Sequence, residues 1–376
     1  MIARSAAPWL LLVALAAAPQ AQAPDPARVD AAVRKGLGTI KAAGENTLNA
    51  HQAPELALLA MAHAGVREND PEFNALLKSM LVRPLQATYR VALQAMVLEE
   101  VERVKYQDRI RQCAQFLVDT QSSNGQWSYA HEKIPIPAGD GDTPTVEDPA
   151  ARPVDYDKVV VFQDPDSGGK PTVRRKITVK RTRTDTLAAG DNSNSQYAAL
   201  GLRACHDAGI LIPKETVEKA SKWWRECQIQ EPGSPTGPAS RGWGYMGRSG
   251  SAYGSMSAGA VGALAILMHI EGKDWRQDAS LNAGVRWLAD HFSVTENPGR
   301  GKGVDYYYLY GLERAGMLYG TTKFGKNDWY AEGAATLLQA QAPDGSWGSP
   351  VNTSFAILFL KKATRALVST SDARAR

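Results

Sequence analysis

Cysteine is scarce in this 376-residue chain, which contains only Cys113, Cys205 and Cys227. The three residues are odd in number and form no Cys-x-x-Cys pair, so the spacing of a zinc finger or a redox centre is absent. We expect buried free thiols, with a disulfide plus one spare thiol as the alternative. A G-x-S-x-G turn is also missing, so the sequence gives no sign of a nucleophilic triad.

The chain also lacks an excess of charge of one sign. Its 43 basic and 39 acidic residues give a formal net charge of +4, which is close to balance for this length. Because binding to a polyanion relies on a strong positive field, no nucleic-acid partner is indicated. An apolar fraction of 44% is enough to bury a sizeable core.

An apolar run from Pro8 to Ala18 lies near the N-terminus, after Arg4 and before the small-x-small segment 21–23. This arrangement is typical of a cleaved export signal, which we place at residues 1–23. The run is too short to cross a bilayer comfortably. We therefore expect an exported protein, periplasmic or secreted, whose mature chain 24–376 is a single domain without an integral membrane span.

Helical segments of two kinds alternate along the mature chain. One kind is rich in alanine on nearly all sides, as at 51–62, and suits a helix surrounded by other helices. The other is amphipathic, as at 215–227 and 279–291, and suits a helix with one side in water. The amphipathic segments are expected to begin near Pro26, Pro71, Tyr106, Pro213, Asp274 and Gly325, and the alanine-rich ones near Ala50, Gln86, Asn192, Ala252, Val304 and Val351. Six of each predict an all-α fold, an (α/α)6 toroid of six inner and six outer helices.

Two turns with the same spacing of Gln, Gly and Trp follow amphipathic segments, at 121–127 and 341–347, and a weaker copy runs from Gln228 to Trp243. The Gly turns the chain, the Gln amide can bond backbone groups at the helix end, and the Trp covers the joint. These turns resemble the QW repeats of squalene cyclases and their relatives. That resemblance, together with the helix count, covers almost the whole mature chain.

The region from 133 to 191 interrupts the helical pattern and is rich in Pro, Gly, Asp and Thr. Within it, 158–162 and 172–181 alternate like two strands around a Gly-containing turn, which predicts a β-hairpin with a strongly basic second strand. The two interpretations are a strand edge protected by its charge, and an anion-binding flap over the ring mouth. The edge at 158–181 is also a candidate contact for a protein partner.

Several segments resemble exported bacterial toroid proteins with prenyltransferase or squalene-oxidase repeats. They are 192–209, 243–245, 254–256, 291–299 and 307–316. The resemblance implies the fold and the compartment, and it implies no established activity.

Residues 191–196 are the nearest counterpart of the DxDDT segment with which squalene-type cyclases protonate an alkene. Asp191 keeps the first acid, but Ser193 and Asn194 stand where the carboxyl pair is needed, and an amide cannot supply the proton. This departure argues against cyclisation of that type. The alternatives are that Asp191 or Asn192 caps the helix, or that Asn194 and Gln196 bond a polar ligand.

Protein prenyltransferases of this fold bind zinc, and the resemblance implies that such a site would lie at the starts of the inner helices. The site needs an Asp-x-Cys pair and a later His. The corresponding positions here are Asp305-Tyr306-Tyr307 and Asn352-Thr353, so two of the three ligands, the Cys and the His, are missing. The six histidines show no paired metal spacing. We therefore predict no catalytic zinc and no cofactor.

Residues 305–316 contain the richest set of candidate side chains. Helical spacing places Tyr306, Tyr310 and Glu313 on one face, and Tyr307, Tyr310 and Arg314 on an overlapping one. The structural interpretation is a packed tyrosine stripe with a Glu313–Arg314 ion pair. The functional one is a cavity with catalytic candidates Asp305, Tyr307, Glu313 and Arg314, and a ligand-contacting set of Asn192, Asn194, Gln196, Tyr253, Ser255, Met256, Tyr306, Tyr310 and Asn352.

Three functions follow from these observations. The first is a non-catalytic binding or scaffold protein that holds a small-molecule, saccharide or isoprenoid ligand. The second is an enzyme, a lyase, hydrolase or terpenoid cyclase-like protein, acting on a saccharide or isoprenoid in the ring. The third is a structural ring that binds a protein partner through the hairpin.

Overall fold

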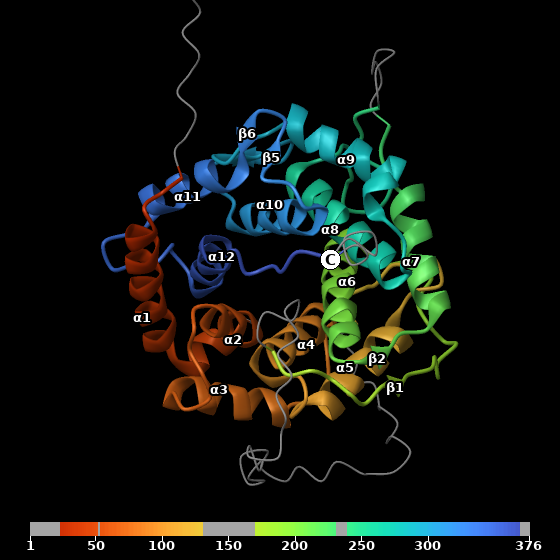
Figure 1. Cartoon of the computed structure of the whole chain (residues 1–376), viewed down its shortest axis with the longest axis horizontal. Helices are drawn as coiled ribbons and strands as arrows, with labels where there is room; N and C mark the ends of the chain where they lie inside the picture. Colours follow the sequence, from red (N-terminus) through yellow and green to blue (C-terminus); the bar gives the residue numbers. More distant parts are fainter. Residues whose placement is uncertain (1–22, 52, 131–169, 231–238, 369–376) are drawn as a thin grey trace, which may run out of the picture.

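The protein folds as two concentric layers of α-helices around a common centre (Figure 1). The computed structural model describes residues 23–51, 53–130, 170–230 and 239–368. The outer helices are α1 (Pro26–Ala50), α3 (Pro71–Val82), α5 (Gln107–Thr120), α7 (Lys214–Glu226), α9 (Ala279–Asp290) and α11 (Trp329–Ala340). The inner helices are α2 (Pro54–His63), α4 (Thr88–Glu102), α6 (Asn192–Asp207), α8 (Gly254–Ile270), α10 (Tyr306–Tyr319) and α12 (Pro350–Leu360).

The inner helices form a closed ring. Each one packs against the next along the chain, and α12 packs back against α2. The predicted all-α toroid is therefore confirmed. None of the helices in the described ranges is both long enough and apolar enough to cross a membrane.

The two layers differ in how their side chains are buried. In α8 every residue from Gly254 to Met268 is buried, as expected for a helix with neighbours on all sides. In α7 the buried residues form one stripe, at Thr216, Val217, Ala220, Ser221 and Trp224. Lys–Glu pairs four residues apart cover its opposite face. The alternation read from the sequence thus reflects position in the ring.

Two outer helices begin later than predicted. A 3-10 turn, η2 (Trp275–Gln277), comes before α9, and Asp278 rather than Asp274 caps that helix. A small antiparallel pair, β5 (Lys323–Phe324) and β6 (Asn327–Asp328), comes before α11, where Asp328 is the cap. In both cases an Asp side chain that accepts backbone N–H bonds fixes the first turn.

Three turns joining outer to inner helices share one geometry; we call them the Gln–Trp turns, residues 121–127, 228–243 and 341–347. In the described part of each turn, the Gln amide donates to a carbonyl inside the turn and to a carbonyl of the next outer helix around the ring, which is α7, α9 and α1 in turn. The Trp indole donates to a carbonyl in the preceding outer helix, and the Trp backbone N–H donates to a Ser or Thr of the following inner helix. Each turn therefore ties three helices together, including the copy with the weaker sequence signal.

The three cysteines are buried and unpaired, as expected from the sequence. Burial raises the pKa of Cys113 to about 12 and that of Cys227 to about 12, so neither thiol ionises at neutral pH. The cysteines serve as packing residues.

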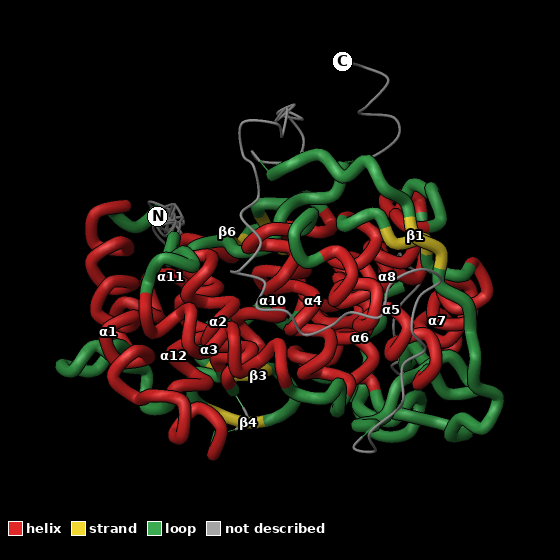
Figure 2. Tube along the Cα trace, turned by 90° about the horizontal axis from the view of Figure 1, so that it is seen from below, coloured by secondary structure: helices red, strands yellow, loops and turns green. Residues whose placement is uncertain are grey.

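The predicted hairpin at 158–181 is only partly described, because its first strand lies outside the described residues. The predicted second strand, 172–181, is described throughout, but only β1 (Ile177–Thr178) within it is a strand, and β1 pairs in parallel with β2 (Ile210–Leu211). Gln107 and Gln115 of α5 donate to backbone carbonyls of this segment, so it packs along the outer helix. The third small pair is β3 (Glu296–Asn297) with β4 (Gly301–Lys302), on the opposite side of the ring from β1 (Figure 2).

Candidate functional site

The first turns of five inner helices surround a cavity of about 510 Å³, which we call the main cavity. It is lined by Ala50, His51, Ala53, Leu56, Tyr89, Leu93, Tyr129, Ser193, Asn194, Tyr197, Tyr307, Val351 and Phe355. This lining combines aromatic rings and aliphatic groups with a few hydroxyl and amide groups. Among the described residues it includes no carboxylate, lysine or arginine.

A second cavity of about 450 Å³ adjoins the first and shares Tyr307, Val351 and Phe355 with it; we call it the side cavity. The loop between β3 and β4 contributes Arg300, and α10 and α12 contribute their first turns. Its lining includes the predicted residues Asp305, Tyr306 and Asn352. The side cavity is therefore the more polar of the two.

Tyr307 is the residue at which the two cavities meet. Gln196 Nε2 donates to its hydroxyl at 2.6 Å, and Ser193 Oγ lies 2.9 Å from the same oxygen. Its ring stacks on that of Tyr197 and contacts Phe355 edge-on. Burial raises the pKa of Tyr307, so the hydroxyl stays protonated and the side chain cannot act as a base at neutral pH.

Arg314 lies behind Tyr307, fully inside the ring. Its Nη2 donates to Gln196 Oε1 at 2.9 Å, and its guanidinium lies 4.2 Å from the centre of the Tyr310 ring. Within the described residues it forms no ion pair, and its Nη1 atom has no hydrogen-bond partner. The Glu313–Arg314 ion pair considered from the sequence is not formed. The guanidinium group of Arg314 is thus a buried cation outside the cavity lining, and it contacts the Gln196 amide and the face of the Tyr310 ring.

Asp191 is the N-cap of α6, as one of the sequence interpretations had it. Its Oδ1 accepts the Asn194 backbone N–H at 2.7 Å, and its Oδ2 accepts the Asn194 side-chain amide at 2.8 Å. Asn194 lines the main cavity, and its own Oδ1 is buried without a partner. The carboxylate is therefore occupied by helix capping, and the Asn194 amide has one buried oxygen without a hydrogen-bond partner.

Asp305 also acts as a cap. It accepts the Tyr308 N–H at 2.9 Å and the Asn297 amide at 2.8 Å. Asn297 in turn accepts the Ser255 N–H and donates to the Ser255 hydroxyl. The loop before α10 is tied by these bonds to the start of α8, where Arg300 covers the Tyr253 ring.

Glu313 does not line either cavity. Its two carboxylate oxygens accept the backbone N–H and the hydroxyl of Thr364, at 2.9 and 2.7 Å. Complete burial raises the pKa of Glu313 to about 7, although the Thr364 bonds oppose that shift. Glu313 therefore holds the segment after α12, which crosses the centre of the ring (Figure 1).

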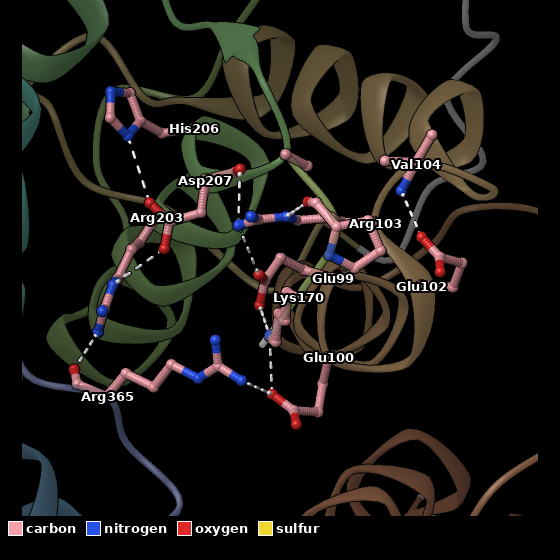
Figure 3. A network of polar contacts seen from close by, with 12 residues as sticks. Glu99, Glu100, Glu102, Arg103, Val104, Lys170, Arg203, His206, Asp207 and Arg365 are labelled. Atoms are coloured by element: carbon pink, nitrogen blue, oxygen red, sulfur yellow. Dashed lines mark hydrogen bonds and ion pairs between the residues drawn. The ribbon is translucent and has the colours of Figure 1, made fainter. Parts of the chain in front are cut away.

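A network of charged side chains occupies the end of the ring where the inner helices finish (Figure 3). Lys170 Nζ lies 2.6 Å from Glu99 and 2.8 Å from Glu100, and Arg365 approaches Glu100 at 3.5 Å. We call Glu99, Glu100, Lys170 and Arg365 the charged network. Only a cavity of about 60 Å³ remains beside it, lined in part by Tyr310 and Thr364.

The remaining predicted residues lie in packed surroundings. Asn192 is fully buried, accepts the Trp223 indole N–H and donates to the Gly244 carbonyl. Met256 belongs to the hydrophobic core. Gly259 allows α8 to pack closely against α6, because a Cβ at this position would lie 2.3 Å from Gln196 Oε1.

Several lining residues were not predicted from the sequence. Tyr89, Leu93 and Phe355 lie on the first two turns of inner helices, and Tyr197 lies on the second turn of α6. The signal that was available is their position, because every inner helix contributes its first turns to the cavity. Tyr129 comes from the loop between α5 and the insertion, and its position carried no such signal.

The chain is similar in fold to solved structures of terpene cyclases. Type II terpene cyclase MstE from Scytonema, in complex with merosterolic acid A, matches with a TM-score of 0.51 and 12% identity, over 90% of this chain and 97% of the other. A complex of that cyclase with geranylgeranyl dihydroxybenzoate matches with a TM-score of 0.52 at 12% identity, again over 90% and 97%. No protein-family model and no curated protein matches the chain. At this identity the likeness establishes the fold alone: the chain is an α-helical toroid similar to the terpene cyclases.

Proposed function

We propose that the ring binds an elongated apolar molecule with a polar head, an isoprenoid or a similar lipid, in the main cavity, and that it leaves this ligand chemically unchanged. The observation that carries the proposal is the lining of that cavity: aromatic and aliphatic side chains from five inner helices, with isolated hydroxyl and amide groups. Such a composition is typical of sites for small apolar ligands with one polar end.

The polar groups of the lining suit the head of such a ligand. The free Oδ1 of Asn194 is an acceptor for a hydroxyl, and Ser193 and the Tyr307 hydroxyl lie beside it on the same wall. A hydroxyl bonded to Asn194 would remove the cost of leaving a buried amide oxygen unpaired, about 1–3 kcal/mol. The aromatic rings of Tyr89, Tyr197 and Phe355 would contact the chain.

The same lining argues against proton-initiated cyclisation. That reaction needs a carboxylic acid at the alkene, and no described residue of the main cavity supplies one. Asp191 is separated from the cavity by Asn194, and both of its oxygens accept hydrogen bonds from that residue.

A terpenoid cyclase-like enzyme is the second candidate, and one observation favours it. The aromatic faces of Tyr89, Tyr197, Tyr307 and Phe355 around the main cavity are suited to stabilising a carbocation. Asp191 is hydrogen-bonded to Asn194, which lines the main cavity. A movement of the Asn194 side chain would therefore expose the Asp191 carboxyl group to the ligand. The similarity to solved cyclase structures agrees with this alternative as much as with binding alone.

The test uses the purified full chain and geranylgeranyl dihydroxybenzoate as the probe, with a soluble oligosaccharide in a parallel titration. Calorimetry measures binding, and NMR of the recovered probe counts its alkene protons, because cyclisation changes these without changing the mass. Saturable binding with all alkene signals retained supports the proposal. Loss of alkene signals would establish the enzyme instead, and absence of binding, or preference for the oligosaccharide, would refute it.

A variant that fills the cavity makes the test specific. Val351 is half-buried, lines both cavities and lies on the first turn of α12, so Val351→Trp should reduce the space for the chain while the ring still folds. We expect affinity for the probe to fall at least about tenfold, or about 1.4 kcal/mol. The matched control is Val82→Trp on α3, where the parent side chain is 65% exposed and far from the lining.

Export, and a protein partner at 158–181, remain proposals that rest on the sequence. Residues 1–22 of the predicted export signal and the first half of 158–181 lie outside the described residues. Both proposals are compatible with a lipid-binding ring, since an exported protein that shelters an apolar molecule carries it through water.

A further inference from the structure

Two histidines and an aspartate meet at the end of the ring opposite the main cavity. His206 and Asp207 close α6, and His269 lies in the last turn of the neighbouring helix α8. One donor atom from each of the three residues lies within 4.8 Å of the other two. The closest of these approaches joins His206 Nδ1 to Asp207 Oδ1 at 3.4 Å. Donors bound to one ion at about 2.0–2.2 Å in a tetrahedron are separated by about 3.4 Å, so a small inward movement completes the spacing.

Within the described residues, the ring nitrogens of His269 are not used in hydrogen bonds. In the described part of the chain, His269 makes ring contacts with His206 and Trp275 but no hydrogen bond through either nitrogen. An imidazole nitrogen that is not engaged elsewhere can serve as a metal ligand.

The surroundings hold the carboxylate in place. Arg203 Nε lies 3.4 Å from Asp207 Oδ2, which leaves Oδ1 turned toward His206 (Figure 3). The Arg203 guanidinium repels a cation, and it also orients the carboxylate, as outer partners of metal ligands do. All three residues are partly buried, so the site is reached from solvent without being a mobile surface cluster.

We propose that His206, Asp207 and His269 bind one divalent transition-metal ion, with zinc as the best match, between the ends of α6 and α8. Two imidazoles and one carboxylate are a ligand set that zinc accepts, with a fourth position left for water. The ion would join two inner helices at the end of the ring that does not hold the main cavity. The sequence-based expectation of no metal rested on spacing within single segments, whereas these histidines come from two helices.

The test is zinc binding to the untagged full chain after treatment with a chelator. Calorimetry and elemental analysis measure stoichiometry, and Co²⁺ absorption reports tetrahedral coordination. We expect one ion per chain, and at least about tenfold weaker binding in each of His206→Gln, Asp207→Asn and His269→Gln. The matched control is His291→Gln, because His291 is exposed and belongs neither to the cluster nor to the lining of the two cavities.

The outcomes separate the proposal from a folding defect and from the proposed lipid binding. Each variant is first melted in chelator; if His269→Gln is unfolded, His206→Gln, with a side chain 38% exposed, carries the test. Zinc binding that survives all three substitutions, or that is equally weakened by His291→Gln, would overturn the site. Binding of the lipid probe by the metal-free protein is measured in parallel, so failure of one proposal does not decide the other.

Discussion

The two ends of the inner ring are built from the same helices and have opposite chemistry. Where the helices begin, side chains such as Tyr89, Asn194 and Phe355 surround about 510 Å³ of space. Where they finish, the charged network and the segment held by Glu313 leave only about 60 Å³. We call the end where the inner helices begin the hollow end, because it contains the main cavity, whose described lining has no charged side chain of Asp, Glu, Lys or Arg. We call the end where they finish the filled end, because charged side chains and the segment after α12 occupy it.

The direction of the helices explains this difference. Because all inner helices begin at one end, their unpaired N–H groups gather there, and Asp191, Asp305 and Ser349 satisfy some of them as caps. The last carbonyls gather at the other end, where cationic or partly cationic side chains are favoured, and His63, His206 and His269 lie in the last turns. At the hollow end Asp191 and Asp305 are therefore used for capping, and Glu55 is paired with Arg90, which leaves the cavity wall to aromatic and amide groups.

Removing Lys170, the central cation of the charged network, should cause the largest loss of stability and shows whether the two ends of the ring are independent. Lys170→Met leaves Glu99 and Glu100, both mostly buried, facing each other without their shared ammonium group. We expect a loss of about 3 kcal/mol in the free energy of unfolding, measured by urea titration. Probe binding at the hollow end should be unchanged in the folded variant, and a parallel loss of affinity would show that the two ends are not independent.

Ionisation of Glu313 should make the filled end sensitive to pH. Its folded pKa of about 7 lies above the value of 4.5 for a free side chain, so its favourable contribution is complete below pH 4.5 and is lost as pH rises through 7. The isosteric Glu313→Gln does not ionise; its oxygen can still accept the Thr364 backbone N–H, and its amide N–H can donate to the Thr364 hydroxyl, which reverses the direction of that bond. Relative to the parent, it should gain about 2–3 kcal/mol of stability between pH 4.5 and pH 8, measured by denaturation at each pH. An unchanged difference across that range would contradict the assignment.

Placing an acid in the hollow end should cost stability there. Asn194→Asp removes the amide that donates to Asp191 Oδ2 and sets two carboxyl groups against each other. We expect a loss of about 1–2 kcal/mol at pH 8 and a smaller loss at pH 5, where one of the pair holds a proton. Asn352→Asp, in the side cavity, is the control and should show no such pH dependence.

The smallest expected effect concerns the hydroxyl between the cavities. Tyr307→Phe leaves Gln196 Nε2 without the acceptor that it has at 2.6 Å. Thermal denaturation should show a loss of about 1 kcal/mol. Tyr306→Phe, on the side-cavity wall, is the control and should stay within about 0.5 kcal/mol of the parent. Equal losses in both variants would mean that the Gln196 bond contributes nothing specific.

Much of the fold followed from the sequence because position in the ring dictates composition. A helix with neighbours on all sides must be small and apolar throughout, as α8 is, and a helix on the rim must be amphipathic, as α7 is. The starts of α9 and α11 were missed because short non-helical elements precede them and a nearby Asp sets the first turn instead.

The candidate site followed only in part. Helical spacing correctly grouped Tyr307, Tyr310 and Arg314, since those residues lie on one side of α10. It could not show which neighbour each face meets, so the sequence left open whether Glu313 lines the cavity or packs elsewhere, and the structure shows that it contacts Thr364. The meeting of His206 with His269 depends on the packing of two helices far apart in sequence, which no local pattern reports.

Hydrogen–deuterium exchange of the full chain, with and without geranylgeranyl dihydroxybenzoate, tests the contrast between the two ends most directly. If the ligand occupies the hollow end, exchange should slow in the first turns of the inner helices, at 53–57, 88–93, 192–197 and 350–355, while the last turns and residues 363–367 keep their rates. Protection centred on the last turns, or no protection at saturating probe, would contradict the account.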